Sequence, residues 1–284
     1  MKNKRLTYVL FLVLISVKLV GQTDLQLNYK YSEDFKRPVF SVIKLHLHNG
    51  KIDKLYSDTL KTIDLFKPHY IGESGSYSLY VLFANNNLKT DSLTYDFKLN
   101  GKETDVKIDI SFYIDRQRIR QGGQWLEKPP IPHGIIYVTK YYKAPKSVLI
   151  NLDSTKLGDE DYKGPFFKLT NNSRDTIYGE YLPGYFWGTL SIQRNDSTWS
   201  RKYTGNIDME FAGKPPLSPG TSRIATVGSF GMFKKLVKTS YCYELLFTKN
   251  KMSPGASLYE DHKTFQWWAI TNEFYRLKYK FKIE

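Results

Sequence analysis

The sequence predicts an all-β protein that consists of two antiparallel β-sandwich domains in series. Apolar and polar residues alternate with a period of two in many short segments, whereas the 3.6-residue period of an amphipathic helix is scarce. Turn-forming pairs such as Asn100-Gly101 and Pro219-Gly220 recur at short intervals. The 22 tyrosines and 17 phenylalanines also favour strands. Many short strands joined by regular turns are typical of β-sandwiches.

Residues 1–21 are expected to form a secretory signal peptide. Three basic residues precede an apolar run over residues 6–17, and Lys18 ends this run before it is long enough to span a bilayer comfortably. Cleavage after Gly21 would leave a mature chain without a transmembrane segment. An uncleaved membrane anchor is the alternative interpretation.

Charge and cysteine content narrow the function classes. The formal net charge is +14, which favours anionic partners. The single cysteine, Cys242, excludes an internal disulfide or a Cys-rich zinc site, and its strand-like surroundings predict a buried, inert thiol. We expect an exported protein of the periplasm or cell surface of a bacterium, for which nucleic acid is a poor candidate partner.

The first sandwich is expected over residues 22–114. Its segments place apolar residues on one face and polar residues on the other, as in an antiparallel sheet that packs on one side. The apolar faces comprise Leu25, Leu27, Tyr29 and Tyr31; Tyr77, Leu79, Val81 and Phe83; Leu93, Tyr95, Phe97 and Leu99; and Val106, Ile108, Ile110, Phe112 and Ile114.

A linker over residues 115–134 is expected to separate the two domains. This stretch combines charged residues, the pair Gly122-Gly123 and clustered prolines, which interrupt regular structure. The second sandwich then covers residues 135–284.

Two family resemblances refine this fold class. The glycine turn and alternating strand of Gly75–Val81 resemble a transthyretin-like or carboxypeptidase-regulatory-like β-sandwich. Phe167–Ser173, Asp175–Gly179 and Leu217–Gly220 resemble bacterial immunoglobulin-like domains of envelope proteins, and Trp199 resembles the aromatic residue of their middle strands. The resemblances imply two immunoglobulin-like modules for adhesion, scaffolding or ligand binding. They supply no catalytic motif.

No recognised arrangement of residues predicts a metal, a cofactor or catalysis. His46 and His48 are expected on one exposed strand face, but zinc needs three or four ligands. The acidic residues 159–161 lack the spacing of a calcium loop. Motifs for nucleophilic catalysis are absent from the sequence. A glycan-acting hydrolase whose carboxylates cannot be recognised by spacing remains an alternative.

The last strand-like segment carries a candidate contact surface for an anion or a partner. Period-2 alternation predicts a row of cations opposite the apolar residues of this strand. The alternative is that the lysines protect an exposed strand from aggregation. The four cations are Arg276, Lys278, Lys280 and Lys282.

Three tryptophans are candidate ligand-binding residues. Trp267 and Trp268 are adjacent in a strand-like stretch, so they are expected to point to opposite faces. Trp187 follows a Pro-Gly turn. Exposed rings are surfaces on which sugars or proteins stack, whereas core packing is the alternative role.

These observations predict a non-catalytic binding or scaffolding protein that contacts another envelope protein. A polysaccharide-binding module is the first alternative, and the hydrolase is the second. Asn171–Ser173 matches the N-glycosylation pattern, which matters only in a eukaryotic secretory pathway.

Overall fold

The computed structural model describes strands and their connections over most of the chain, and within that part it contains no helix. The predicted all-β class is therefore confirmed. No helix in this part has the length and apolar character needed to cross a membrane. The described residues are 22–31, 40–48, 53–60, 69–84, 90–115, 118–121, 124–127, 131–153, 165–180, 182–194, 198–203, 214–227, 238–251, 257–262 and 265–283.

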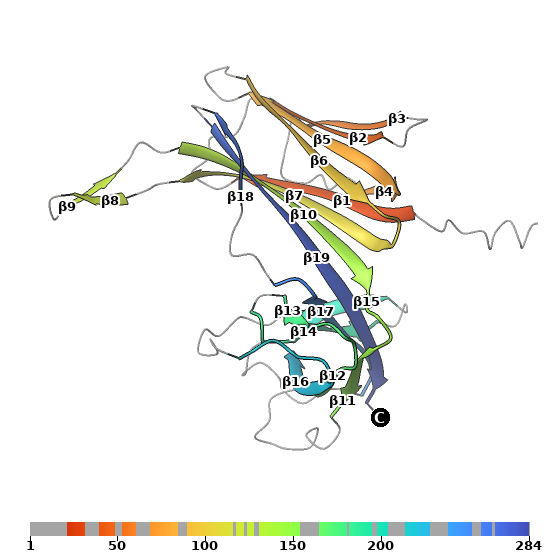
Figure 1. Cartoon of the computed structure of the whole chain (residues 1–284). Coiled ribbons are helices and arrows are strands. Elements are labelled where there is room, and N and C mark those ends of the chain that lie inside the picture. Colours follow the sequence, from red (N-terminus) through yellow and green to blue (C-terminus); the bar gives the residue numbers. More distant parts are fainter. Residues whose placement is uncertain are drawn as a thin grey trace, which may run out of the picture. The chain divides into compact units, whose positions relative to one another are not determined.

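The chain divides into two compact units (Figure 1). The first unit comprises residues 1–140 and 256–271, and the second comprises residues 141–255 and 272–284. Two long strands, β10 and β19, contribute residues to both units. Their bounds are Ile131–Lys143 and Phe265–Lys282.

Two sheets enclose the core of the first unit. The larger sheet has the strand order β19-β10-β7-β1-β4, with β18 paired to β19, and the smaller sheet has the order β3-β2-β5-β6. The additional strands are β1 (Gln22–Tyr31), β2 (Phe40–His48), β3 (Asp53–Leu60), β4 (His69–Glu73), β5 (Gly75–Ala84), β6 (Thr90–Leu99), β7 (Glu103–Asp115) and β18 (Ser257–His262).

Side chains from both sheets meet in one hydrophobic core, so the first unit is β-sandwich-like. The hydroxyl of Tyr95 on β6 also lies 2.8 Å from that of Thr271 on β19. The predicted apolar faces are buried as expected at Leu25, Leu27, Tyr77, Leu79, Val81, Leu93, Phe97, Leu99, Val106, Ile108 and Ile110. Tyr95 is partly buried against this core. The side chains of five other predicted residues lie outside the described part of the chain: Tyr29, Tyr31, Phe83, Phe112 and Ile114.

Pairing is not wholly antiparallel, which differs from the expectation. Strand β1 pairs with β7 in parallel, with Leu25 opposite Val106. A parallel pair needs a long crossover connection, and β2 to β6 lie between these two strands in the sequence. The sequence pattern shows which residues face the core, but it does not show the direction of the neighbouring strand.

The expected linker contains regular structure. Strands β8 (Arg118–Gln121) and β9 (Gln124–Glu127) pair antiparallel, with Gln121 opposite Gln124. Two residues, Gly122 and Gly123, separate them, and a Gly-Gly pair between two strand segments is itself a hairpin signal. The residues on both sides of these glycines thus form strands inside the expected linker. The boundaries of the two expected domains stay a prediction.

The second unit is built on a curled sheet with the strand order β11-β12-β16-β14-β17-β19. The ring of Phe167 on β12 lies 6.1 Å from that of Tyr279 and 5.8 Å from that of Phe281, both on β19. Strands far apart in the sheet order thus face each other across one core. The strands are β11 (Val148–Leu152), β12 (Phe166–Asn171), β13 (Tyr178–Gly179), β14 (Trp187–Gln193), β15 (Trp199–Tyr203), β16 (Thr221–Val227) and β17 (Ser240–Thr248).

Tyr243 on β17 lies at the centre of this core. Its ring stacks on Phe167 at 3.9 Å, and its hydroxyl donates a hydrogen bond of 2.9 Å to the carbonyl of Thr226. Burial raises the pKa of Tyr243 well above its ordinary value. Gly188 leaves room for the ring, because a Cβ there would lie 2.3 Å from Tyr243 Cζ. This close approach explains a glycine inside strand β14.

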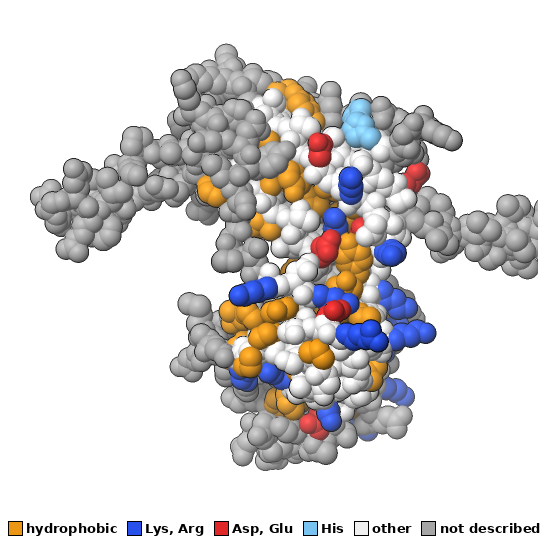
Figure 2. All heavy atoms as spheres, viewed as in Figure 1, with side chains coloured by type: hydrophobic (Ala, Val, Ile, Leu, Met, Phe, Trp, Pro, Cys, Tyr) orange, Lys and Arg blue, Asp and Glu red, His pale blue; other side chains and the backbone are white. Residues whose placement is uncertain are grey.

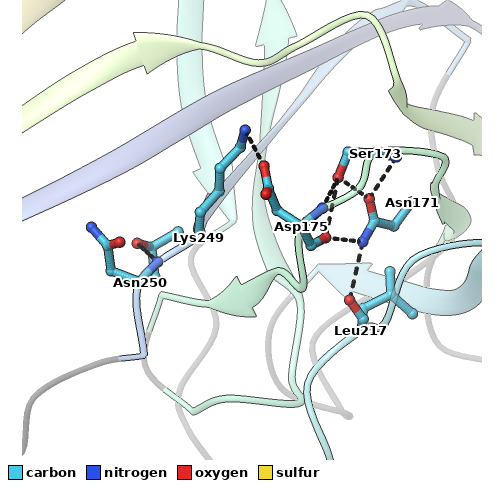
Figure 3. A network of polar contacts seen from close by, with 7 residues as sticks. Asn171, Ser173, Asp175, Leu217, Lys249 and Asn250 are labelled. Atoms are coloured by element: carbon cyan, nitrogen blue, oxygen red, sulfur yellow. Dashed lines mark hydrogen bonds and ion pairs between the residues drawn. The ribbon is translucent and has the colours of Figure 1, made fainter.

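A polar network fixes the turn after β12 (Figure 3). The amide nitrogen of the Asn171 side chain donates to the carbonyls of Asp175 at 2.8 Å and Leu217 at 3.1 Å. Its side-chain oxygen accepts from the backbone nitrogen and the hydroxyl of Ser173. Lys249 then pairs with Asp175 at 2.7 Å. Asn171 is fully buried, and both polar atoms of its side chain make these hydrogen bonds. The Asn and Ser that match the glycosylation pattern are therefore explained by their role in this turn.

Candidate binding face of the second unit

Strand β19 separates apolar and cationic side chains by the parity of its residue numbers. Tyr275, Leu277, Tyr279 and Phe281 pack against the core of the second unit. The intervening side chains of Arg276, Lys278, Lys280 and Lys282 therefore lie on the opposite face, as predicted. Arg276 is partly buried and the three lysines are exposed. We call the surface formed by these four side chains with Glu244 and Trp199 the cationic face.

The register of the neighbouring strands completes this surface. Glu244 and Cys242 on β17 lie opposite Lys278 and Lys280. Ser191 on β14 lies opposite Cys242 in turn. On β15, Trp199 pairs with Gln193 of β14. Strands β19, β17, β14 and β15 thus pair in succession, in this order. Figure 2 shows Lys and Arg side chains (blue) on the surface of the molecule in view.

Glu244 holds two of the four cations. Its carboxylate oxygens lie 3.3 Å from Arg276 Nε and 3.2 Å from Lys278 Nζ. Arg276 is further positioned by Tyr141, because its guanidinium carbon lies 4.6 Å from the centre of that ring. Phe274 stacks on the same ring at 6.3 Å. The Arg276 end of the cationic face is therefore ordered by contacts within the unit.

Lys280 and Trp199 form the other end of the face. Lys280 Nζ lies over the Trp199 ring, 5.6 Å from its centre. The strands between them carry Cys242 and Ser191, whose small side chains let the two long ones meet. Trp199 keeps 37% of its surface exposed. An exposed indole beside an ammonium group can contact a ligand through both apolar area and charge.

Cys242 is buried, as the sequence predicts. Burial raises the pKa of its thiol, and the nearby charge of Lys278 opposes this effect only in part. The thiol therefore stays protonated at neutral pH, which makes it a poor nucleophile.

The three candidate tryptophans differ in burial. Trp267 is fully buried in the core of the first unit, where its ring packs so closely on Gly134 that a Cβ there would lie 2.3 Å away. We therefore remove Trp267 from the candidate ligand-binding residues. Trp268, also in the first unit, is partly buried. Trp187, in the second unit, is partly buried and stacks on Tyr185 at 5.2 Å.

Sequence reasoning missed Trp199 as a surface residue. The pairing of β14 with β15 shifts its register between Leu190 and Ser191. Leu190 pairs with Tyr203, but Ser191 pairs with Arg201. Such a shift depends on the partner strand. Local alternation gives no signal that Trp199 is exposed, because the polar neighbours Thr198 and Ser200 would place an intervening Trp on the core face.

His46 and His48 lie in the first unit with their ring centres 5.3 Å apart, and His48 is exposed. His48 Nε2 lies 3.1 Å from the hydroxyl of Ser78, which donates to Asp96 Oδ1 at 2.5 Å. Within the described ranges, no group of three or more His, Cys, Asp or Glu side chains is placed to hold a metal ion.

Comparison with known proteins finds no family model that matches the chain, no matching curated protein and no matching solved structure.

Proposed function

We propose that the chain is a non-catalytic, exported binding protein of a bacterial envelope that contacts an anionic partner through the cationic face. The observation that carries this proposal is the alignment of Lys278, Lys280 and Lys282 on one exposed strand face beside Trp199. Alternate residues of a strand are about 7 Å apart. An extended partner with repeated negative charges would therefore meet the three lysines in succession.

Electrostatics define the charge of the partner and the conditions of binding. Attraction between exposed charges is screened over about 10 Å at 0.1 M salt. The positive net charge would also increase the rate at which an anion reaches the face. Binding should therefore be strong at low salt and weaken as salt is added.

A pair of matched triple variants tests the proposal. The first replaces Lys278, Lys280 and Lys282 by Gln. The control replaces Lys146, Lys168 and Lys251, which are exposed elsewhere in the second unit, and changes the net charge equally. Binding of the purified chain to immobilised polyanions would be measured at low and high salt.

We expect the first variant to lose about fivefold to one hundredfold in affinity, because three cation contacts of a few tenths to one kcal/mol are removed together. The control should lose less than about twofold. Equal losses in both variants would show that net charge alone attracts polyanions. Increased aggregation of the first variant with unchanged binding would instead assign the lysines to protection of the strand. Release of reducing ends from a bound glycan would contradict the non-catalytic role.

A further inference from the structure

We infer that Trp199 and Lys280 form a subsite for an acidic sugar, so that the anionic partner is an acidic polysaccharide. This inference rests on the proposed function of the cationic face. It adds a second chemistry, because Trp199 supplies a flat apolar surface that cations alone do not provide.

Trp199 is exposed enough to contact a sugar. Its ring lies on the cationic face with 37% of its surface uncovered, whereas Trp267 shows that the same fold buries another indole completely. A pyranose ring has a face of C–H groups that can lie flat on an aromatic ring and cover it. An acidic peptide segment needs only the lysines.

Lys280 is placed to reach a sugar that lies on Trp199. Its ammonium lies 5.6 Å from the centre of the Trp199 ring. A cation–π contact at an exposed site is weak, and the lysine side chain is long and flexible. A sugar that stacks on the indole can therefore draw Lys280 from the ring to its own carboxylate. One sugar residue would then satisfy both side chains.

The ion pairs of Glu244 involve other cations of the face than Lys280. Glu244 takes Arg276 and Lys278 at the other end of the face, while Lys280 lies over Trp199. The intramolecular carboxylate therefore competes with the ligand less at Lys280 than at Arg276 or Lys278. The ligand's acidic group should accordingly be held beside the indole.

Isothermal titration with three polymers tests the inference. The polymers are polygalacturonate, poly-glutamate of matched charge and neutral dextran. The proteins are the unchanged chain, Trp199→Ala, Trp199→Phe and the control Leu149→Ala, which removes another exposed apolar side chain of the second unit (45% exposed). Thermal unfolding would verify that each variant folds.

We expect polygalacturonate to bind more tightly than poly-glutamate, and dextran not to bind. Trp199→Ala should weaken polygalacturonate binding about tenfold, as for an aromatic contact at the centre of an interface. It should leave poly-glutamate binding within about twofold. Trp199→Phe should retain most of the affinity because it keeps a ring, and Leu149→Ala should change neither polymer's binding.

Two other results would overturn the inference in distinguishable ways. If both polyanions bind equally and Trp199→Ala affects them alike or not at all, the face binds charge without a sugar subsite, and an acidic protein becomes the expected partner. If neither polyanion binds the unchanged chain, the proposed function itself fails. The three variants keep all lysines, so a change in net charge cannot cause a selective loss of polygalacturonate binding.

Discussion

Replacing Glu244 by Gln should change binding and stability in opposite directions. The carboxylate lies 3.3 Å from Arg276 Nε and 3.2 Å from Lys278 Nζ, and it lies within the face proposed to bind an anion. In the free protein the carboxylate neutralises part of this surface. In a complex it would repel the ligand and compete for both cations.

The magnitudes follow from the exposure of the three groups. The exposed fractions are 33% for Glu244, 22% for Arg276 and 54% for Lys278. Ion pairs in such solvated positions contribute about 0.2–1 kcal/mol each. The free energy of unfolding should fall by about 1 kcal/mol, which lowers Tm by about 2–4 °C in a chain of this size. Relief of a comparable repulsion of about 1 kcal/mol should tighten polyanion binding about fivefold.

Titration calorimetry and thermal unfolding at low and high salt would measure the two effects. Asp175→Asn is the matched control, since it removes a carboxylate that pairs with Lys249 at 2.7 Å elsewhere in the second unit. The control should change polyanion affinity by less than about twofold. Unchanged or weaker binding in Glu244→Gln would refute the assignment of the anion site to this face. A gain of affinity equal to that of the control would show that only net charge matters.

Three other side chains test the packing of the two units. Trp267→Ala should lower the free energy of unfolding by about 3–5 kcal/mol, because it empties a fully buried position, and denaturant titration would measure this loss. Asn171→Ala should cost about 1–3 kcal/mol in the same assay, because the buried carbonyl and amide partners of its network lose bonds. Burial raises the pKa of the Cys242 thiol, so this thiol ionises at lower pH in the unfolded chain than in the folded one, and the free energy of unfolding should decline above pH 9.0. Iodoacetamide at pH 8 should alkylate the folded chain much more slowly than the chain in denaturant. Equal alkylation rates would contradict the burial of Cys242.

Core positions of the first unit were predictable because they depend on local alternation. Side chains of a strand point to opposite faces in turn, so Leu79 and Val81 are buried whichever strand lies beside them. The same rule places the cations of β19 opposite its core residues. Sequence patterns therefore gave the faces of the strands in both units.

Pairing partners and register were not predictable in the same way. The parallel pair of β1 and β7 brings together residues about eighty positions apart, and no local pattern encodes this choice. The shift between Leu190 and Ser191 likewise depends on how β14 meets β15, and it determines the register of Trp199. Trp267 was chosen as a binding candidate by its residue type, and it is a core residue.

Charge repulsion within the cationic face destabilises the free protein, and an anionic partner would reduce this repulsion. From residue 275 onward the odd-numbered residues of β19 supply its packing, so the even-numbered positions there can carry any strand-forming polar residue. Like charges at alternate positions, about 7 Å apart, repel each other by roughly 0.6 kcal/mol even in water. Glu244 offsets this repulsion at Arg276 and Lys278. At Lys280, an anion bound beside Trp199 would supply a countercharge, which is why salt should weaken the complex while it stabilises the unbound face.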